Sequence, residues 1–288
     1  MWLGERRGFA IDWLTQLWVR ATGRRVRLEV HPWLDAPIGG TRHVGSTWLG
    51  AEPAPALGLL ESFDQLAGPR FDPAAISEEV RRFYTRTSEY RLDLWASWSL
   101  FGGMGARMLR SAHARRLDQL NLPIDVMEAS TGISSDVFRV DRIGMPAEAA
   151  WLRRYQDSKR VIYAGVYSVC RPDGQPPLVK VAFPLPNGNV VVLLRPENST
   201  DGALRLVSRG RRFGEPGMYL TVADVAGVVS VRRTPVAEVF TVYESAPREL
   251  RTDHLIAIYG YRLARLHYRI ERKDFSASGT TIDVDTPS

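Results

Sequence analysis

The chain has 288 residues and a mass of 32.3 kDa; 44% of the residues are hydrophobic and 24% are charged, close to the globular average. This composition excludes a disordered chain, a collagen-like fibre and a coiled coil, and no run of about 18 apolar residues suggests a transmembrane helix. The net charge is +6, and only three of the 38 basic residues are lysines, so arginine dominates. The arginines occur as dispersed singles and pairs among 32 acidic residues, which makes nucleic-acid binding an unfavoured interpretation despite a pI near 9.7.

Residues 1–30 are expected to form an amphipathic helix followed by a basic strand or arm, and its large apolar residues recur at helical spacing: Phe9, Trp13, Leu14, Leu17 and Trp18. Two interpretations remain open. A basic helix with tryptophan on its apolar face can lie on a membrane surface, or it can pack on the main domain as a brace. Without a cleavage-site pattern, we expect a cytoplasmic protein, peripheral at the membrane if the helix binds lipid. Residues 1–70 form this N-terminal extension, and the proline- and glycine-rich stretch 50–73 is its candidate linker or surface loop.

Residues 71–135 are expected to form a helical segment. Asp72 is a candidate N-cap with Pro73 in the first turn, and Ile76, Val80, Phe83, Tyr84 and Thr87 form the apolar stripe of this helix. The uncharged stretch 94–106 follows; its three glycines break any regular helix. It is interpreted as a core-packing hairpin, as a gate over a barrel mouth with Trp95 and Trp98 contacting an apolar ligand, or as a segment that dips into a bilayer. A second helix with a basic face is expected over 108–120.

From residue 136 the pattern alternates with period two between turn signals, of which Asn187-Gly188 is the strongest. A short helix is expected around 147–157, and the candidate strands are 136–142, 160–171, 178–185, 189–197, 203–209, 218–225, 228–233, 236–245 and 254–270. The fold class is therefore α+β: N-terminal helices and an irregular segment pack on an antiparallel β-barrel or strongly curved meander over 136–275, and 276–288 form a disordered tail. The architecture is similar to lipocalin-like small-ligand barrels, as an analogy of fold alone.

Side-chain parity in the strands identifies candidate site residues, because alternate residues face opposite sides of a sheet. In the last strand Leu266 and Tyr268 define the inward set, and counting back adds Arg262 and His254 to it. A β-bulge at Gly260 would turn the side chain of His254 to the opposite face of the sheet. In 236–244 the same rule places Glu238 among apolar neighbours.

Glu238, His254 and Arg262 are thus candidate acid–base residues of an apolar pocket. The alternative is a purely structural role, in which a buried glutamate and arginine form an ion pair with each other inside the barrel and bind no ligand. The candidate ligand-binding residues are aromatic or basic: Trp95, Trp98, Tyr163, Tyr167, Arg195, Tyr243 and Tyr261.

Common cofactor and catalytic motifs are absent from the sequence, including the P-loop, H-E-x-x-H, G-x-S-x-G and C-x-x-C patterns. The five histidines lack metal-ligand spacing, and the single cysteine, Cys170, is expected to be a packed thiol in a strand. We therefore predict no cofactor and no metal. The expected partner is a hydrophobic or aromatic small molecule, and the expected activity is cofactor-independent isomerisation or cyclisation by proton transfer. The alternatives are a non-enzymatic lipid-binding or peripheral membrane protein, and an interaction module whose barrel is filled by side chains.

Overall fold

The computed structural model describes residues 10–38, 57–99, 133–140 and 148–273. The predicted helix 108–120, most of the stretch 94–106 and the predicted tail 276–288 lie outside these residues. Two α-helices are described, α1 (Ala10–Thr22) and α2 (Glu78–Thr85). The strands are β1 (Arg24–Arg27), β2 (Tyr90–Trp98), β3 (Ile133–Val140), β4 (Glu148–Tyr155), β5 (Val161–Cys170), β6 (Leu178–Leu185), β7 (Gly188–Asn198), β8 (Leu204–Val207), β9 (Gly217–Ala223), β10 (Val228–Arg233), β11 (Val236–Ala246), β12 (Glu249–Ile258) and β13 (Tyr261–Arg272).

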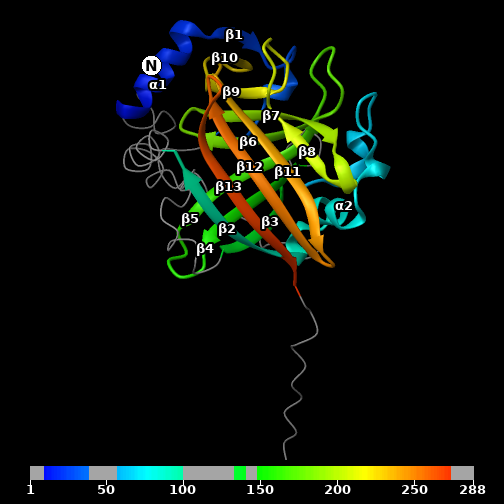
Figure 1. Ribbon diagram of the computed structural model, residues 1–288. Helices are drawn as coiled ribbons and strands as arrows, with labels where there is room; N and C mark the ends of the chain where they lie inside the picture. Colours follow the sequence, from blue (N-terminus) through cyan, green and yellow to red (C-terminus); the bar gives the residue numbers. More distant parts are fainter. Residues whose placement is uncertain (1–9, 39–56, 100–132, 141–147, 274–288) are drawn as a thin grey trace, which may run out of the picture.

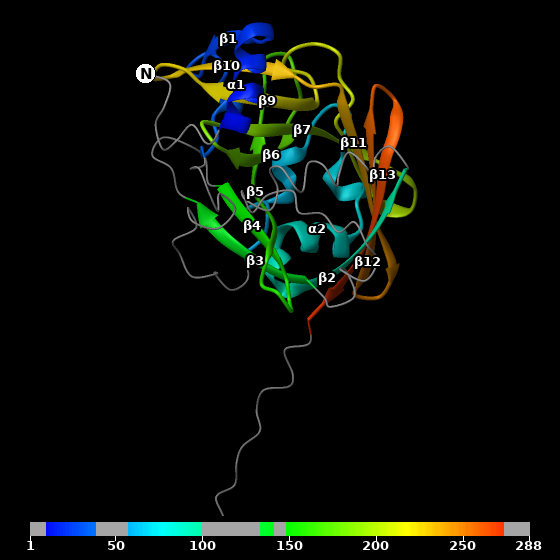
Figure 2. The same ribbon diagram turned by 90° about the vertical axis from the view of Figure 1, so that its left-hand side faces the viewer.

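Ten of the strands close into an antiparallel barrel, which confirms the predicted fold class (Figures 1 and 2). The order around the barrel is β7-β6-β5-β4-β3-β2-β13-β12-β11-β8, and β8 returns to β7. The strand β7 divides between two partners: residues 188–193 pair with β9, and residues 195–198 pair with β8. Strands β9, β10 and β1 therefore extend the sheet beyond the barrel wall.

The hairpin between β6 and β7 shows how the sequence dictates this topology. Leu185 pairs with Gly188, so Pro186 and Asn187 form a two-residue loop, and Asn187 has a φ of 56° that asparagine tolerates well. A Cβ atom at Gly188 would lie 2.0 Å from the carbonyl oxygen of Thr221 on β9. Glycine at this position therefore allows β9 to approach β7 where the extension begins.

The helix α2 fills one end of the barrel, as Figure 2 shows. It begins after Ser77, whose hydroxyl accepts a hydrogen bond from the Val80 amide, whereas the predicted N-cap Asp72 caps only a short 3-10 helix, Pro73–Ala75. The predicted apolar stripe is buried, and Phe83 packs edge-on against Tyr90 of β2 and Trp151 of β4. These contacts anchor α2 among the inner side chains of the barrel.

Three sequence-based expectations for the sheet are wrong. The segment 147–157 is not a helix but contains β4, and the predicted single strand 254–270 is a hairpin whose turn is Tyr259-Gly260. Within the segment 71–135 that was expected to be helical, residues 90–98, which include the start of the uncharged stretch 94–106, form β2, and β2 pairs with β13 along its whole length. The barrel therefore recruits a strand from this segment.

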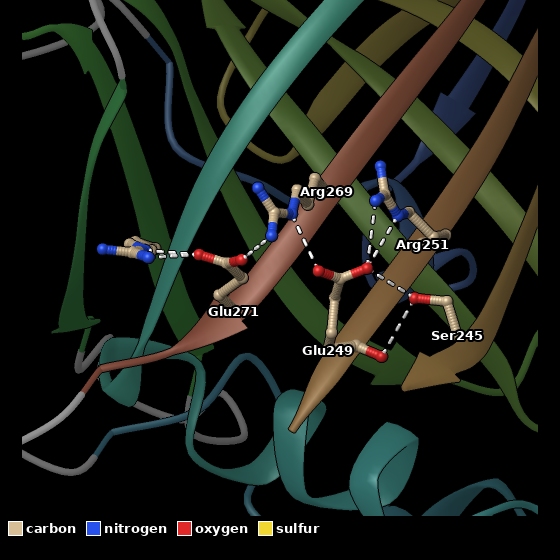
Figure 3. Close-up of polar contacts among 6 residues, drawn as sticks. Ser245, Glu249, Arg251, Arg269 and Glu271 are labelled. Carbon is tan, nitrogen blue, oxygen red and sulfur yellow. Dashed lines mark hydrogen bonds and ion pairs between the residues drawn. The ribbon is translucent and has the colours of Figure 1, made fainter. Parts of the chain in front are cut away.

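An arginine–glutamate cluster ties four neighbouring strands together on the outer face of the barrel (Figure 3). The Glu249 carboxylate on β12 accepts hydrogen bonds from Ser245 (2.8 Å), Arg251 (3.0 Å) and Arg269 (2.8 Å). Glu271 on β13 pairs with Arg269 and with Arg91 of β2. The hydrogen bonds from Ser245 and Arg269 are the main cause that lowers the pKa of Glu249 to about 2. The carboxylate is therefore ionised at all but strongly acidic pH.

Candidate functional site

The barrel encloses a cavity of about 390 Å³ between its strands and α2. Its wall is mainly aliphatic and aromatic, and it includes Phe83 and Tyr84 from α2, Leu59 from the segment before α2, and Trp98 from the end of β2. A few polar side chains interrupt the wall: Arg153, Glu238, Thr252, His254 and the hydroxyl groups of Tyr84, Tyr163, Tyr167 and Tyr268. Small-molecule sites commonly combine an apolar wall of this kind with a few convergent polar groups.

Arg153 is the buried cation of the cavity. On β4 it lies on the same inward face as Trp151 and Tyr155. Its side chain lines the cavity, and the residue is only 4% exposed. The guanidinium carbon lies 3.6 Å from the centre of the Trp151 ring, 4.8 Å from Tyr163 and 5.2 Å from Tyr268, so aromatic faces stabilise the charge. Its Nε atom is buried without a hydrogen-bond partner. A donor of this kind is available to an acceptor atom of a ligand.

His254 of β12 and Glu238 of β11 lie close together in the cavity wall, and the Tyr268 ring lies near both His254 and Arg153. The Nε2 atom of His254 lies 3.8 Å from a carboxylate oxygen of Glu238. The imidazole stacks on Phe240, its partner in the strand register, with ring centres 3.7 Å apart and an interplanar angle of 17°. His254 is 6% exposed, and neither ring nitrogen has a hydrogen-bond partner. Both ring nitrogens are therefore available to a ligand in the cavity.

Four tyrosines supply neutral hydroxyl groups. Burial raises the pKa of Tyr84, Tyr163, Tyr167 and Tyr268 well above the ordinary value, and the positive charge of Arg153 opposes this effect without cancelling it. The four phenols therefore remain protonated across the physiological range. They can donate hydrogen bonds to a ligand, but they do not serve as bases.

The sequence-based site residues divide between the cavity and the outer surface. Glu238, His254, Trp98, Tyr163 and Tyr167 line the cavity. Trp95 is 40% exposed and contacts His267 on the outer face, and Tyr261 is 78% exposed beside the β12–β13 turn. Tyr243 does not line the cavity, because its neighbour Val242 occupies the inward position.

Arg195 also lies outside the cavity. The inward residues of β7 are Val190, Val192 and Leu194, so Arg195 belongs to the opposite face. There its guanidinium donates to Glu197 at 2.6 Å. Arg195 therefore faces away from the cavity.

The inward orientation predicted for Arg262 is wrong. Arg262 is exposed, and Leu263 lines the cavity in its place. The cause is a bulge in β13: Ala257 pairs with Arg262, but the next residue of β12, Ile256, pairs with Ala264. The extra residue, Leu263, shifts the alternation by one position at the end of the strand.

Sequence reasoning missed Arg153, which lies at the centre of the polar groups. The sequence of its segment predicts a helix, in which Trp151, Arg153 and Tyr155 would not share a face as they do in β4. Inward Tyr268 was noted only as an apolar residue, although its hydroxyl faces the cavity beside Arg153. A period-two interpretation of residues 149–155 would have found the arginine.

The remaining chemistry of the described residues is sparse. No group of three or more histidine, cysteine, aspartate or glutamate side chains in the described ranges is arranged to hold a metal ion. Burial raises the pKa of the Cys170 thiol to about 12, which leaves it protonated and unreactive. Within the part of the chain that the structure covers, no helix has the length and apolarity needed to span a membrane. Comparisons with protein-family models, curated proteins and solved structures gave no match.

Proposed function

We propose that the barrel binds a hydrophobic or aromatic small molecule in its central cavity. The observation that supports this most directly is the coexistence of open apolar space with buried nitrogen atoms that lack partners, on Arg153 and His254. Buried polar groups in a purely structural core are normally satisfied within the protein. A barrel filled by its own side chains is the alternative, and a cavity of 390 Å³, within the range of known ligand pockets that starts at about 300 Å³, weighs against it.

The polar groups also indicate what kind of ligand fits. Arg153 and the protonated tyrosines are hydrogen-bond donors, and they lie among aromatic rings. A ligand with an apolar or aromatic body and one acidic or oxygen-bearing end would satisfy them. The rest of the wall offers only dispersion contacts and burial of apolar surface.

Filling the cavity tests this function. Val192 is 1% exposed and faces the cavity, so Val192→Phe is expected to place its ring in the open space and weaken binding of the neutral fluorophore N-phenyl-1-naphthylamine about tenfold. The matched control is Val225→Phe at a site that is 58% exposed, and it should leave the affinity unchanged. Fluorescence titration gives both constants. Equal affinity for all three proteins would contradict binding in the barrel, and native mass spectrometry of the wild type would show whether a compound co-purifies.

We further propose that Glu238 and His254 catalyse proton transfer on the bound molecule, as in an isomerase or cyclase. Their separation of 3.8 Å and their position in an apolar cavity support a shared role as base and acid. Glu238, as the carboxylate, would remove a proton from a carbon acid, and His254, as the imidazolium, would return one at a second position. The proton held by Glu238 would then pass to His254, 3.8 Å away, so that both groups return to their starting forms without a co-reactant.

Hydrogen exchange tests the catalytic proposal without knowledge of the product. The compound extracted from the wild-type protein would be incubated with fresh enzyme in D₂O, and its mass increase would be followed over time. Glu238→Gln and His254→Ala are each expected to slow exchange about 100-fold or more. Asp253→Asn, on the outer face of the same strand, is the matched control. No exchange with wild type, or equal exchange with Glu238→Gln, would contradict catalysis while leaving ligand binding in place.

A further inference from the structure

The helix α1 packs on the protein with Asp12, Gln16 and Val19 and exposes much of its apolar side. Asp12, Gln16 and Val19 are at most 5% exposed, and the Gln16 amide donates to the carbonyl oxygen of Pro186 at 3.2 Å. On the other side, Leu14 is 68% exposed, Leu17 47% and Trp18 43%. This orientation is the reverse of what a helix on a soluble domain normally adopts. Both interpretations of the N-terminal helix thus apply to different faces: one packs as a brace, and one is available to a partner.

A strongly basic pocket adjoins this apolar stripe. It has a volume of about 510 Å³ and lies where α1 ends and β1 begins; its wall contains Thr22, Gly23, Phe213, Val231 and five arginines, Arg24, Arg211, Arg212, Arg232 and Arg233. Arg232 joins the two features, because its guanidinium lies 5.7 Å from the Trp18 ring and donates to the Thr22 carbonyl oxygen at 2.8 Å.

The charge in this pocket, which we call the arginine pocket, is compensated only in part, through the electrostatic interaction of Glu215 with Arg212 and Arg233. In the described ranges none of its five guanidinium groups forms an ion pair with a carboxylate. The nearby Glu215 carboxylate instead accepts the backbone N–H groups of Arg211 and Arg212. The pocket can therefore receive anions.

We propose that α1 and the arginine pocket dock the protein on an anionic lipid bilayer. Leucine and tryptophan side chains are the ones that interfacial helices insert at the level of the headgroups, and arginines beside them attract anionic lipid phosphates. A nucleic acid would use the arginines but leave Leu14 and Leu17 exposed to water. A second copy of the chain in a two-fold arrangement would bring like charges together. Only an anionic bilayer complements both features, in the position where Figures 1 and 2 show α1 at the surface beside β9 and β10.

Vesicle sedimentation of the full chain tests the apolar part of this surface. The wild type is expected to bind vesicles of phosphatidylcholine with phosphatidylglycerol and to bind phosphatidylcholine alone about tenfold more weakly. Leu17→Ser/Trp18→Ser should lower the partition coefficient about tenfold. The matched control is Trp95→Ser, because Trp95 is an equally exposed tryptophan (40%) on the outer face of β2, and it should change binding by less than about twofold.

The charged part is tested with Arg24→Gln/Arg232→Gln, which should weaken binding to anionic vesicles only and reduce its salt dependence. Arg265→Gln, on the outer face of β13, is the control. All substituted positions are exposed, so circular dichroism and Tm should match the wild type. The proposal is overturned if the wild type does not bind anionic vesicles, or if the α1 variant binds as well as the wild type. It is also overturned if sedimentation equilibrium shows that the wild type is a dimer and that the α1 substitutions convert it to a monomer without changing vesicle binding.

Discussion

Replacement of Arg153 by methionine is expected to weaken binding of an anionic aromatic probe strongly without lowering stability. Loss of a charge-assisted hydrogen bond in a buried site costs about 1.5–3 kcal/mol, which corresponds to about a 10- to 100-fold lower affinity for anilinonaphthalene sulfonate. Methionine fills a similar volume, and a buried cation with an unpartnered Nε atom contributes little net stability. The Tm of Arg153→Met should therefore equal or exceed that of the wild type.

A neutral probe separates the role of the charge from the shape of the cavity. N-phenyl-1-naphthylamine has a related aromatic body and no sulfonate, so its affinity should change by less than about threefold in Arg153→Met. The control is Arg154→Met, the next residue of β4, which points outward and pairs with Asp136 at 3.0 Å. It should leave both probes unaffected. If both affinities fell equally in Arg153→Met, Arg153 would be a packing residue and not the anchor of an acidic group.

The contrast between β7 and β4 shows which strands of the barrel can be predicted from the sequence. In the β6–β7 region, a loop of asparagine and proline residues and a run of β-branched residues indicate the hairpin. In β4 the outward residues Ala150 and Leu152 are also fully buried, in a second small cluster with Phe138 and Val161. A strand that is covered on both faces loses its alternation of polar and apolar residues, and a mixture of alanine, leucine and arginine then resembles a helix. Arg153 was missed for this reason.

His254 and Arg262 show why parity finds some site residues and misplaces others. Counting back from Leu266 as if the strand were continuous places both inward. The actual path contains a two-residue turn and a bulge at Leu263, each of which shifts the count by one. At His254 the two shifts cancel, so it pairs with Leu266 and faces the cavity. At Arg262, which lies between the turn and the bulge, they do not. Bulges depend on the local twist of the sheet, which single-residue patterns do not encode.

The helix α2 is expected to contribute strongly to stability, and Phe83 is the residue that shows it. Its side chain is 3% exposed and packs against Tyr84, Tyr90 and Trp151 at ring-centre distances of 5.2, 5.3 and 6.0 Å. Phe83→Ala should cost about 3–5 kcal/mol, because the lost transfer energy adds to that of the void left behind. Differential scanning calorimetry would show a Tm lower by about 6–20 °C for a protein of this size.

The matched control for Phe83→Ala is Leu14→Ala on α1, a position that is 68% exposed, and its effect should stay within about 0.5 kcal/mol. The conservative variant Phe83→Leu keeps most of the buried volume and should recover more than half of the loss. Because Phe83 also lines the cavity, its truncation enlarges the space available to a ligand. N-phenyl-1-naphthylamine, in saturating amounts, should therefore raise the Tm of Phe83→Ala more than that of the wild type. An unchanged Tm for Phe83→Ala would show that the contacts of α2 with the barrel contribute little to stability.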